Sequence, residues 1–403
     1  MRDSYFNCYF KEKNEVKVFN SISTSIIKLD LEHYEKLINN VDLLTSEEKD
    51  FLKSKCFITD LSPNEEIKKI KDIVIEDKNK IGFITIMPNF KCNFRCKYCY
   101  EKKNKESLSD ELYDKIYQII QKNIKKFSVL NLSWFGGEPS LSINKVIHFN
   151  NKIRRLCKKE NVVLLSSMTT NFYLLNKDNF MKLYNCGIKS YQVTIDGEKA
   201  VHDSYRVLAN GKGTFDIIMS NLVNVKKING NFNITVRLNY DNKTDYEGYL
   251  LDLSNKIGKD KRFNFVFRPI SNWDNVNRDY VCGEKDAIRK MCHLIKTAKA
   301  LGLNCSNYIS QLLSSCYVFY PNNILITEKG LVKQCTVNLD KEDNLFGDLS
   351  NYHITKQMFK FDNCPYCRFF PLCKGGSCKY GETDQNLCFE EKRRVITEIV
   401  NSI

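Results

Sequence analysis

The stretch Met87-Pro-Asn-Phe-Lys-Cys-Asn-Phe-Arg-Cys-Lys-Tyr-Cys-Tyr100 holds Cys92, Cys96 and Cys99 in the spacing C-x3-C-x2-C, with no fourth cysteine nearby. Three thiolates from one loop can hold three irons of a cubane iron–sulfur cluster and leave the fourth iron open to another ligand. Structural zinc sites favour paired C-x2-C units that supply four ligands, which is a different pattern. The spacing therefore indicates an open-iron cluster, and it points to a reaction class.

Around this loop, apolar β-branched runs alternate with amphipathic helical stretches from residue 81 onward. This alternation is typical of a parallel sheet with outer helices, and six repeats predict an α/β fold, a partial (β/α)6 barrel like part of a TIM barrel. The three cysteines follow the first strand, at the edge where such barrels carry their active sites. The predicted strands are residues 82–87, 130–135, 162–168, 191–195, 233–238 and 263–267.

Two further regions flank the barrel. Residues 1–80 predict a small α+β unit, with strands at 5–10, 16–19 and 25–30, helices at 31–39 and 46–55, and a linker helix or connection at 64–80. After a helix at 284–300 the periodicity fades and cysteines dominate, until a last helix at 389–401. We therefore expect three domains, 1–80, 81–300 and 301–403.

The composition narrows the class of protein. The chain has 17 cysteines, an odd number, and its start has no signal-peptide pattern, so metal or cluster binding is a better interpretation than a disulfide framework. No apolar run is long enough to cross a bilayer, and the expected location is cytoplasmic. The formal charge of +14 suits an acidic partner, but no basic stripe with interleaved aromatics indicates nucleic acid.

The cysteine loop, with Tyr98 before its last cysteine, resembles the radical S-adenosylmethionine (SAM) superfamily. The run Trp134-Phe-Gly-Gly-Glu-Pro139 looks like the G-G-E-P motif of that family, and Thr194-Ile-Asp-Gly197 with His202, Asp203 and Arg206 looks like its S/T-x-D-G…H-D-x-x-R segment. The resemblance implies that the loop cysteines hold a 4Fe-4S cluster. It also implies a set of residues that bind SAM: Tyr98, Gly136, Gly137, Glu138, Pro139, Asn171, Thr194, Arg206 and Arg237.

The resemblance also gives expected roles. Glycines 136 and 137 would let the backbone approach the methionine part of SAM, and Glu138 would accept a hydrogen bond from its amino group. Asn171 would bind the ribose hydroxyls, and Arg237 is a candidate partner for the carboxylate. The implied chemistry is reductive cleavage of SAM to a 5′-deoxyadenosyl radical, which takes a hydrogen atom from the substrate. The electron would come from a flavodoxin- or ferredoxin-type donor, and no catalytic base is identified.

The later cysteines resemble the SPASM extension, which binds two auxiliary 4Fe-4S clusters and would bring the total to three. The resemblance assigns Cys364, Cys367, Cys373 and Cys388 to an outer cluster, and Cys316, Cys335 and Cys378 to an inner one. The sequence departs from the usual pattern by one extra residue between Cys373 and Cys378. The fourth inner ligand is either Cys305 or an open iron, and a zinc ribbon is the alternative for the whole region.

Three functions follow as expectations. The first is a maturase that installs a thioether, C–C or C–O crosslink on a ribosomally made precursor peptide. Such maturases often carry an N-terminal recognition domain that resembles a small winged helix, an outline that residues 1–60 match, and the domain would bind the peptide's leader as an added strand. The second is an anaerobic sulfatase-maturating enzyme, which makes formylglycine; in that group an Asp base follows the second auxiliary cysteine, where this chain has Thr336. The third, from another class, is a non-catalytic zinc-binding protein.

Overall fold

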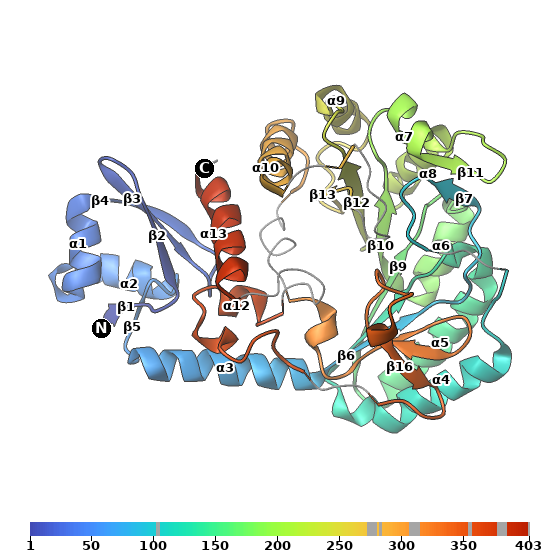
Figure 1. Ribbon diagram of the computed structural model, residues 1–403, viewed down its shortest axis with the longest axis horizontal. Coiled ribbons are helices and arrows are strands. Elements are labelled where there is room, and N and C mark those ends of the chain that lie inside the picture. The colour runs from blue at the N-terminus through green and yellow to red at the C-terminus, as the bar shows by residue number, and fades with distance from the viewer. Residues whose placement is uncertain are drawn as a thin grey trace. The chain divides into compact units, whose positions relative to one another are not determined.

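The computed structural model describes residues 1–101, 105–271, 280–281, 284–305, 315–353, 357–376 and 385–401. Contacts group the chain into two compact units (Figure 1). One unit comprises residues 1–79, 309–321 and 356–403, and the other comprises residues 80–308 and 322–355. Among the helices described, none is both long and apolar enough to cross a membrane. The two units are treated separately below.

The larger unit is built on a parallel sheet whose six central strands neighbour one another in chain order. This arrangement confirms the predicted partial barrel, and each strand starts and ends within about three residues of its expected position. The strands are buried because their apolar β-branched residues face helices on one side of the sheet. They are β6 (Ile81–Ile86), β8 (Val129–Trp134), β9 (Val163–Thr169), β10 (Ile188–Thr194), β12 (Asn233–Tyr240) and β13 (Phe263–Pro269).

Helices connect these strands and cover the outer face of the sheet (Figure 1). Most of them turn an apolar stripe to the strands; α5, for example, buries Val146, Phe149 and Ile153 on one face. Gly187 ends α6 in the left-handed conformation, with φ of 105°, which a side chain would disfavour. The helices are α4 (Asp110–Asn123), α5 (Ile143–Lys159), α6 (Lys177–Cys186), α7 (Lys199–Tyr205), α8 (Phe215–Lys226), α9 (Glu247–Lys256) and α10 (Glu284–Ala300).

Three further strands extend this sheet beyond β6, and the sequence did not predict them. The strand β14 (Asn323–Ile326) lies parallel to β6, and β15 (Leu331–Lys333) and β16 (Leu345–Asp348) continue in antiparallel pairs. The structure therefore distributes residues 301–403 between both units. The predicted division into three domains, with boundaries at 80 and 300, stays a prediction.

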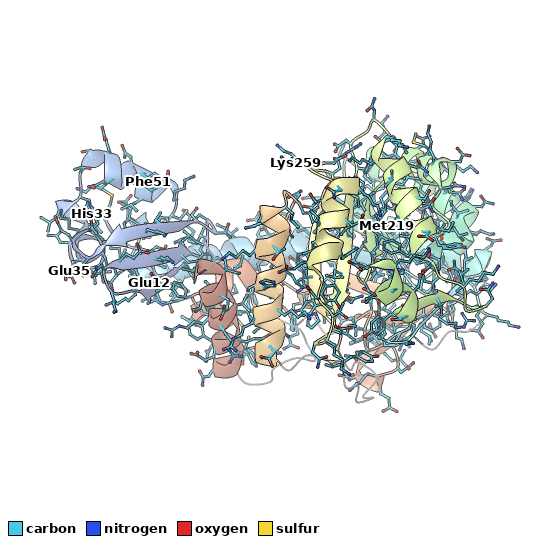
Figure 2. All side chains as sticks on the ribbon, turned by 90° about the horizontal axis from the view of Figure 1, so that it is seen from above. Glu12, His33, Glu35, Phe51, Met219 and Lys259 are labelled. Carbon is cyan, nitrogen blue, oxygen red and sulfur yellow. The ribbon has the colours of Figure 1, made fainter. Side chains whose placement is uncertain are left out.

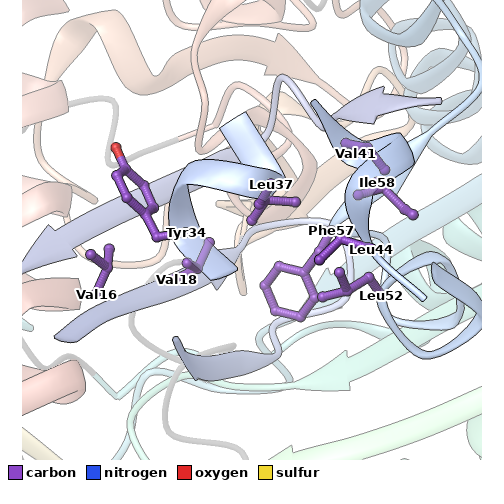
Figure 3. Close-up of a cluster of buried hydrophobic side chains, with 9 residues drawn as sticks. All are labelled: Val16, Val18, Tyr34, Leu37, Val41, Leu44, Leu52, Phe57 and Ile58. Carbon is purple, nitrogen blue, oxygen red and sulfur yellow. The ribbon is translucent and has the colours of Figure 1, made fainter. Parts of the chain in front are cut away.

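The smaller unit begins with an antiparallel sheet in the order β2 (Asn7–Lys11), β3 (Glu15–Asn20) and β4 (Ile26–Asp30). Helices α1 (Leu31–Asn39) and α2 (Ser46–Ser54) follow, and they pack on one sheet face through the core drawn in Figure 3. Side chains cap both helices, α1 by Asp30 and α2 by a reciprocal box between Thr45 and Glu48. His33 and Phe51 lie on α1 and α2, where Phe51 is exposed (Figure 2).

The same unit contains much of the cysteine-rich region. The helix α3 (Pro63–Lys80) shares a second core with the start of the chain and with Cys364 and Phe370. The helices α12 (Phe370–Cys373) and α13 (Gln385–Asn401) complete the unit, and the ammonium of Lys17 on β3 donates to the carbonyl of Val400 on α13. The N-terminal sheet and the last helix of the chain are thus parts of one body.

Candidate active site and cysteine clusters

A cavity opens at the C-terminal ends of the barrel strands, with a volume of about 990 Å³ including the space open to solvent. Pockets of this size are typical of sites for cofactors and small molecules. The structure brings most of the predicted site residues together here, from six separate segments of sequence. The predicted residues that line it are Cys92, Cys96, Cys99, Tyr98, Gly136, Gly137, Glu138, Asn171, Thr194, Arg206 and Arg237. Pro139 is buried beside them at the start of a 3-10 turn, Pro139–Ser142.

The cysteine loop is held in place by a short antiparallel pair that sequence patterns did not show. The strand β7 (Phe94–Cys96) pairs with β11 (Arg206–Leu208), so that Cys96 lies opposite Arg206. Within the loop, the amide of Phe94 donates to the Sγ of Cys92 at 3.4 Å, and the amide of Cys99 donates to the carbonyl of Cys96 at 3.2 Å. An amide that donates to sulfur stabilises a thiolate ligand, so the loop's local structure suits a cluster.

The two glycines of the Gly136–Gly137 turn pack against the chain just before the cysteines. A Cβ on Gly137 would lie 2.2 Å from the carbonyl oxygen of Lys91, and one on Gly136, where φ is +110°, would lie 2.6 Å from that of Asn89. Both glycines are therefore required for the turn to approach the cysteine loop. This contact is a structural reason for the motif, alongside the expected approach to SAM.

Glu138 is fully buried and joins the ends of two strands. Its Oε1 accepts from the Thr170 hydroxyl at 2.7 Å and from the Ser140 amide at 3.0 Å, and its Oε2 accepts from the Asn171 amide at 2.6 Å. Burial raises the pKa of Glu138, while these donors favour the charged form. The carboxylate thereby fixes Asn171, whose side chain in turn donates to the Oδ1 of Asn93 at 2.7 Å.

The hydroxyl of Tyr98 is the centre of a buried network. It accepts from Arg206 Nη1 at 2.8 Å and from Asn239 Nδ2 at 3.1 Å, and it donates to Asp196 Oδ2. Asp196 also accepts from the Asn239 amide at 3.0 Å through Oδ1. Burial raises the pKa of Asp196, whereas the charge of Arg206 lowers it. The network therefore ties the cysteine loop to the ends of β10 and β12 and to β11.

Thr194 and Arg237 are directly opposite each other in the parallel ladder of β10 and β12. The Nε of Arg237 donates to the Oδ1 of Asn239 at 2.7 Å, which orients the guanidinium at the cavity. A guanidinium has five N–H donors and suits bidentate binding of a carboxylate, so this geometry fits the expected role of Arg237.

His202 lies within the barrel wall and supports the loop that carries Arg206. The Asp196 amide donates to His202 Nδ1 at 3.2 Å, and His202 Nε2 lies 3.0 Å from the Thr214 hydroxyl, which itself donates to the Arg206 carbonyl at 2.6 Å. Burial lowers the pKa of His202 to about 2, so the ring is neutral. Asp203 accepts from the amides of Thr214 and Phe215 and so caps α8. The H-D-x-x-R motif is thus a scaffold for the arginine.

The four cysteines assigned to the outer auxiliary cluster all belong to the smaller unit. Cys364 and Cys367 pack in one hydrophobic core, and burial raises the pKa of the Cys373 thiol. The amide of Cys367 donates to the Cys364 carbonyl at 3.0 Å, and Cys388 lies on α13. One unit thus supplies four thiols, a donor set whose chemistry suits iron and sulfide.

The cysteines assigned to the inner cluster are divided between the two units. The amide of Cys316, in the smaller unit, donates to the Gly376 carbonyl at 2.6 Å, beside the outer set. Cys335 is buried in the larger unit, in a turn held by Asn344, which accepts from its amide at 2.9 Å and donates to its carbonyl at 2.8 Å. Cys305 is also buried there, and burial raises the pKa of its thiol to about 12. Cys378 lies outside the described residues.

Sequence reasoning missed three residues that shape these sites. Asp196 stood in the quoted T-x-D-G segment without a role, and its buried position beside Arg206 is evident only in the fold. Asn239 at the end of β12 had no signal beyond its place after an apolar run. Lys392 on α13 donates to Cys388 Sγ at 2.8 Å, and its spacing of four residues on a helix could have indicated this contact. In the described part of the chain, no three His, Cys, Asp or Glu side chains converge on a single metal ion.

Known proteins resemble this chain in sequence. Residues 86–253 match the family described as the Radical SAM superfamily. A cysteine-type anaerobic sulfatase-maturating enzyme of Clostridium novyi is 27% identical over 272 residues, which are 60% of this chain and 71% of that protein. One of Clostridium perfringens (strain 13 / Type A) is 23% identical over 336 residues, which are 73% of this chain and 89% of that protein.

Solved structures share the fold. The structure of anSMEcpe with bound AdoMet and Kp18Cys peptide has a TM-score of 0.56 at 19% identity, and it covers 80% of this chain and 100% of that one. Streptococcus suis SuiB bound to the precursor peptide SuiA has a TM-score of 0.50 at 14% identity and covers 93% of this chain and 95% of that one. These likenesses confirm the fold that the sequence predicted, including its cysteine-rich C-terminal part.

Proposed function

Because this chain is a radical SAM enzyme of the SPASM type, we propose that it matures a ribosomally made precursor peptide by installing a thioether, C–C or C–O crosslink. The observation that carries this proposal is the difference in coverage between the two structural neighbours. About a fifth of this chain has no counterpart in anSMEcpe, whereas SuiB, which was solved with its precursor peptide, covers 93%. The extra length favours a peptide maturase with a recognition domain.

The N-terminal sheet offers an edge for the leader of the precursor. In the part of the chain that the structure describes, β4 pairs only with β3. The Asn20 amide donates to the Ser25 carbonyl. Hydrogen-bonded and non-hydrogen-bonded residue pairs alternate along an antiparallel ladder, so the N–H and C=O groups of Ile26 and Lys28 point to the free edge. A leader strand would pair there, and the exposed ammonium of Lys28 would favour an acidic residue beside it.

In the barrel, we assign SAM to the cavity of the cysteine loop. When bound, the cluster and SAM would supply a carbon radical that takes a hydrogen atom from the peptide. Cys92, Cys96 and Cys99 would hold the iron, and the Gly136–Gly137 turn and Asn171 would orient the amino acid and ribose parts. Arg237 would pair with the carboxylate, while Tyr98 ties the cysteine loop to the strands. The buried walls of this cavity exclude water from the reacting groups.

The crosslink removes two hydrogens from the peptide in total. One would leave as a hydrogen atom to the radical derived from SAM; the other would leave as a proton to solvent and an electron when the new bond forms. Cys364, Cys367, Cys373 and Cys388 would hold an auxiliary cluster, which would supply the acceptor for this electron. The electron that starts the reaction would come from a flavodoxin- or ferredoxin-type donor.

A second candidate is formylglycine formation on a sulfatase, and the identity of 27% to the enzyme of Clostridium novyi favours it. Thr336 counts against it, because it stands after Cys335 where the sulfatase-maturating group places an Asp base. The non-catalytic zinc alternative has no support from any relative above.

Anaerobic co-expression with small open reading frames that neighbour the gene, followed by mass spectrometry, tests the proposal. A precursor that loses two hydrogens and keeps all of its sulfur supports crosslinking. Conversion of a Cys or Ser side chain to an aldehyde, detected with a hydrazine probe, would favour the sulfatase function instead. Cys96→Ala is the matched inactive control.

A further inference from the structure

Lys78, in the last turn of α3, is completely buried, with 0% of its surface exposed. Its ammonium donates to the carbonyl of Met358 at 2.6 Å and lies 5.4 Å and 5.2 Å from the ring centres of Tyr320 and Phe359. One carbonyl and two ring faces leave most of the charge uncompensated, and burying an unpaired ammonium is strongly unfavourable. The position therefore calls for a nearby anion.

Lys392, on another helix, is a second buried lysine. Its side chain is buried on α13, and its ammonium lies 2.8 Å from the Sγ of Cys388. Among the described residues, neither Lys392 nor Lys78 forms an ion pair with a carboxylate. Other lysines of this unit do so at the surface, for example Lys374 with Asp77 at 3.2 Å. The two buried ammonium groups of this unit thus have no carboxylate partner among the described residues.

Cysteines assigned to the outer cluster lie near both lysines: Lys392 contacts Cys388 directly, and Phe359 connects Lys78 to Cys364. The ring of Phe359, below Lys78, packs in the same core as Cys364, and a Cβ on Gly375 would touch both residues. The Gly375 carbonyl lies 3.8 Å from Cys364 Sγ, and the next carbonyl accepts from the Cys316 amide. Burial lowers the pKa of Lys78 to about 8, and Cys373, Cys364 and Cys316 act in the opposite direction.

We propose that Lys78 and Lys392 compensate the negative charge of the iron–sulfur cluster held by Cys364, Cys367, Cys373 and Cys388, and that they raise its reduction potential. This inference rests on the proposed assignment of a cluster to these cysteines. A thiolate-bound cubane is an anion, and reduction adds one further negative charge inside a low-dielectric core. Two fixed ammonium groups stabilise the reduced form more than the oxidised form, which makes the cluster a better one-electron acceptor.

The test uses full-length protein with Cys92, Cys96 and Cys99 all replaced by Ala, so that only auxiliary clusters contribute to the spectra. After anaerobic reconstitution, iron and sulfide are measured, and redox titration is followed by electron paramagnetic resonance. The signal that Cys367→Ala removes identifies the outer cluster. Lys78→Met and Lys392→Met are compared with Lys78→Arg and Lys392→Arg, which keep the charge, and with Lys53→Met, which changes an exposed lysine of the same unit.

Each Met variant is expected to reduce the equilibrium constant for one-electron reduction at least tenfold, a shift of at least 59 mV to more negative potential. The Arg variants and Lys53→Met are expected to keep the parent potential. If a Met variant loses its iron and the Arg variant regains it, the charge role is supported; loss in both would overturn it. An unchanged potential at full iron content would also overturn it. Absence of auxiliary iron in the parent would instead refute the cluster assignment.

Discussion

Arg206 donates from Nη1 to the hydroxyl of Tyr98 at 2.8 Å. Arg206 begins β11, and Tyr98 stands in the loop that follows β7, the strand that pairs with β11. The same hydroxyl donates to Asp196 and accepts from Asn239. One aromatic residue of the cysteine motif is thereby bonded to the residues that end two barrel strands. The position of the third cysteine depends on this network, since Cys99 directly follows Tyr98.

Replacement of Tyr98 by Phe should loosen the cysteine loop. The variant keeps the ring but leaves the Arg206, Asp196 and Asn239 groups without their shared partner. An unsatisfied buried polar group costs about 1–3 kcal/mol, so we expect a clear fall in the thermal midpoint and partial loss of iron after reconstitution. Tyr117→Phe, on the surface of α4, is the control. A Tyr98→Phe protein as stable and iron-rich as that control would show that the network is dispensable.

Glu138→Gln should weaken SAM binding while the protein keeps its iron. Each oxygen of Glu138 accepts a hydrogen bond, one from Thr170 and one from Asn171. In Gln an NH2 group replaces one of these oxygens, so one of the two donors loses its acceptor. Loss of a hydrogen bond to a charged group costs about 1.5–3 kcal/mol, which corresponds to roughly 10- to 100-fold weaker binding. Equilibrium dialysis with labelled SAM measures this change, with the surface variant Glu111→Gln as control. Unchanged affinity would exclude Glu138 from organising the site.

The buried neutral His202 should make the protein sensitive to acid. Its pKa is lowered to about 2 in the folded protein, whereas a histidine in an unfolded chain titrates near 6.5. Below pH 6.5 the unfolded state therefore binds a proton that the folded state does not bind. The stability that the neutral ring contributes above pH 6.5 is lost as the pH falls below that value. For this residue the loss is about 1.4 kcal/mol at pH 5.5.

His202→Asn provides the comparison, because its side-chain oxygen can still accept from the Asp196 amide. Thermal midpoints of both proteins at pH 7.5 and pH 5.5 should show a smaller acid-induced fall in the variant. Equal falls in the two proteins would mean that the ring is not the acid-sensitive group.

The two groups of cysteines should separate cleavage of SAM from product formation. Cys96→Ala should abolish release of 5′-deoxyadenosine, because the iron that SAM requires is lost. Cys367→Ala, in the smaller unit, should still release some 5′-deoxyadenosine but give no crosslinked peptide. Chromatography of the nucleoside and mass spectrometry of the peptide check both outcomes. Full product from either variant contradicts the proposed division of roles.

The barrel could be predicted from sequence because its strands are long apolar runs with a regular spacing, and the cysteine motif fixed which loop carries the chemistry. The strands β7 and β11 have three residues each, too few for any periodicity, and they pair across more than a hundred residues of chain. The strand β14, Asn323-Ile-Leu-Ile326, reads as a short apolar run, and its partner β6 lies far back in the sequence. Long-range pairing of this kind leaves no local signal.

The burial of charged residues also could not be predicted from the sequence. Lys78 stands in the charged run Glu76-Asp-Lys-Asn-Lys80, which predicts a solvated helix face, and only tertiary packing removes its ammonium from water. Glu138 and Asn171 were expected at the site from resemblance, but their mutual hydrogen bond and the network around Asp196 depend on side chains from different strands. Motifs thus predicted which residues gather at the cavity, while the hydrogen bonds that fix them required the fold.

The central claim is that this enzyme crosslinks a peptide bound through its N-terminal domain. Reconstituted protein, SAM, a chemical reductant and a purified precursor should give 5′-deoxyadenosine together with a peptide that has lost two hydrogens and retained its sulfur. Removal of the leader from the precursor should abolish this product. A peptide aldehyde, or equal turnover of the precursor without its leader, would contradict the claim.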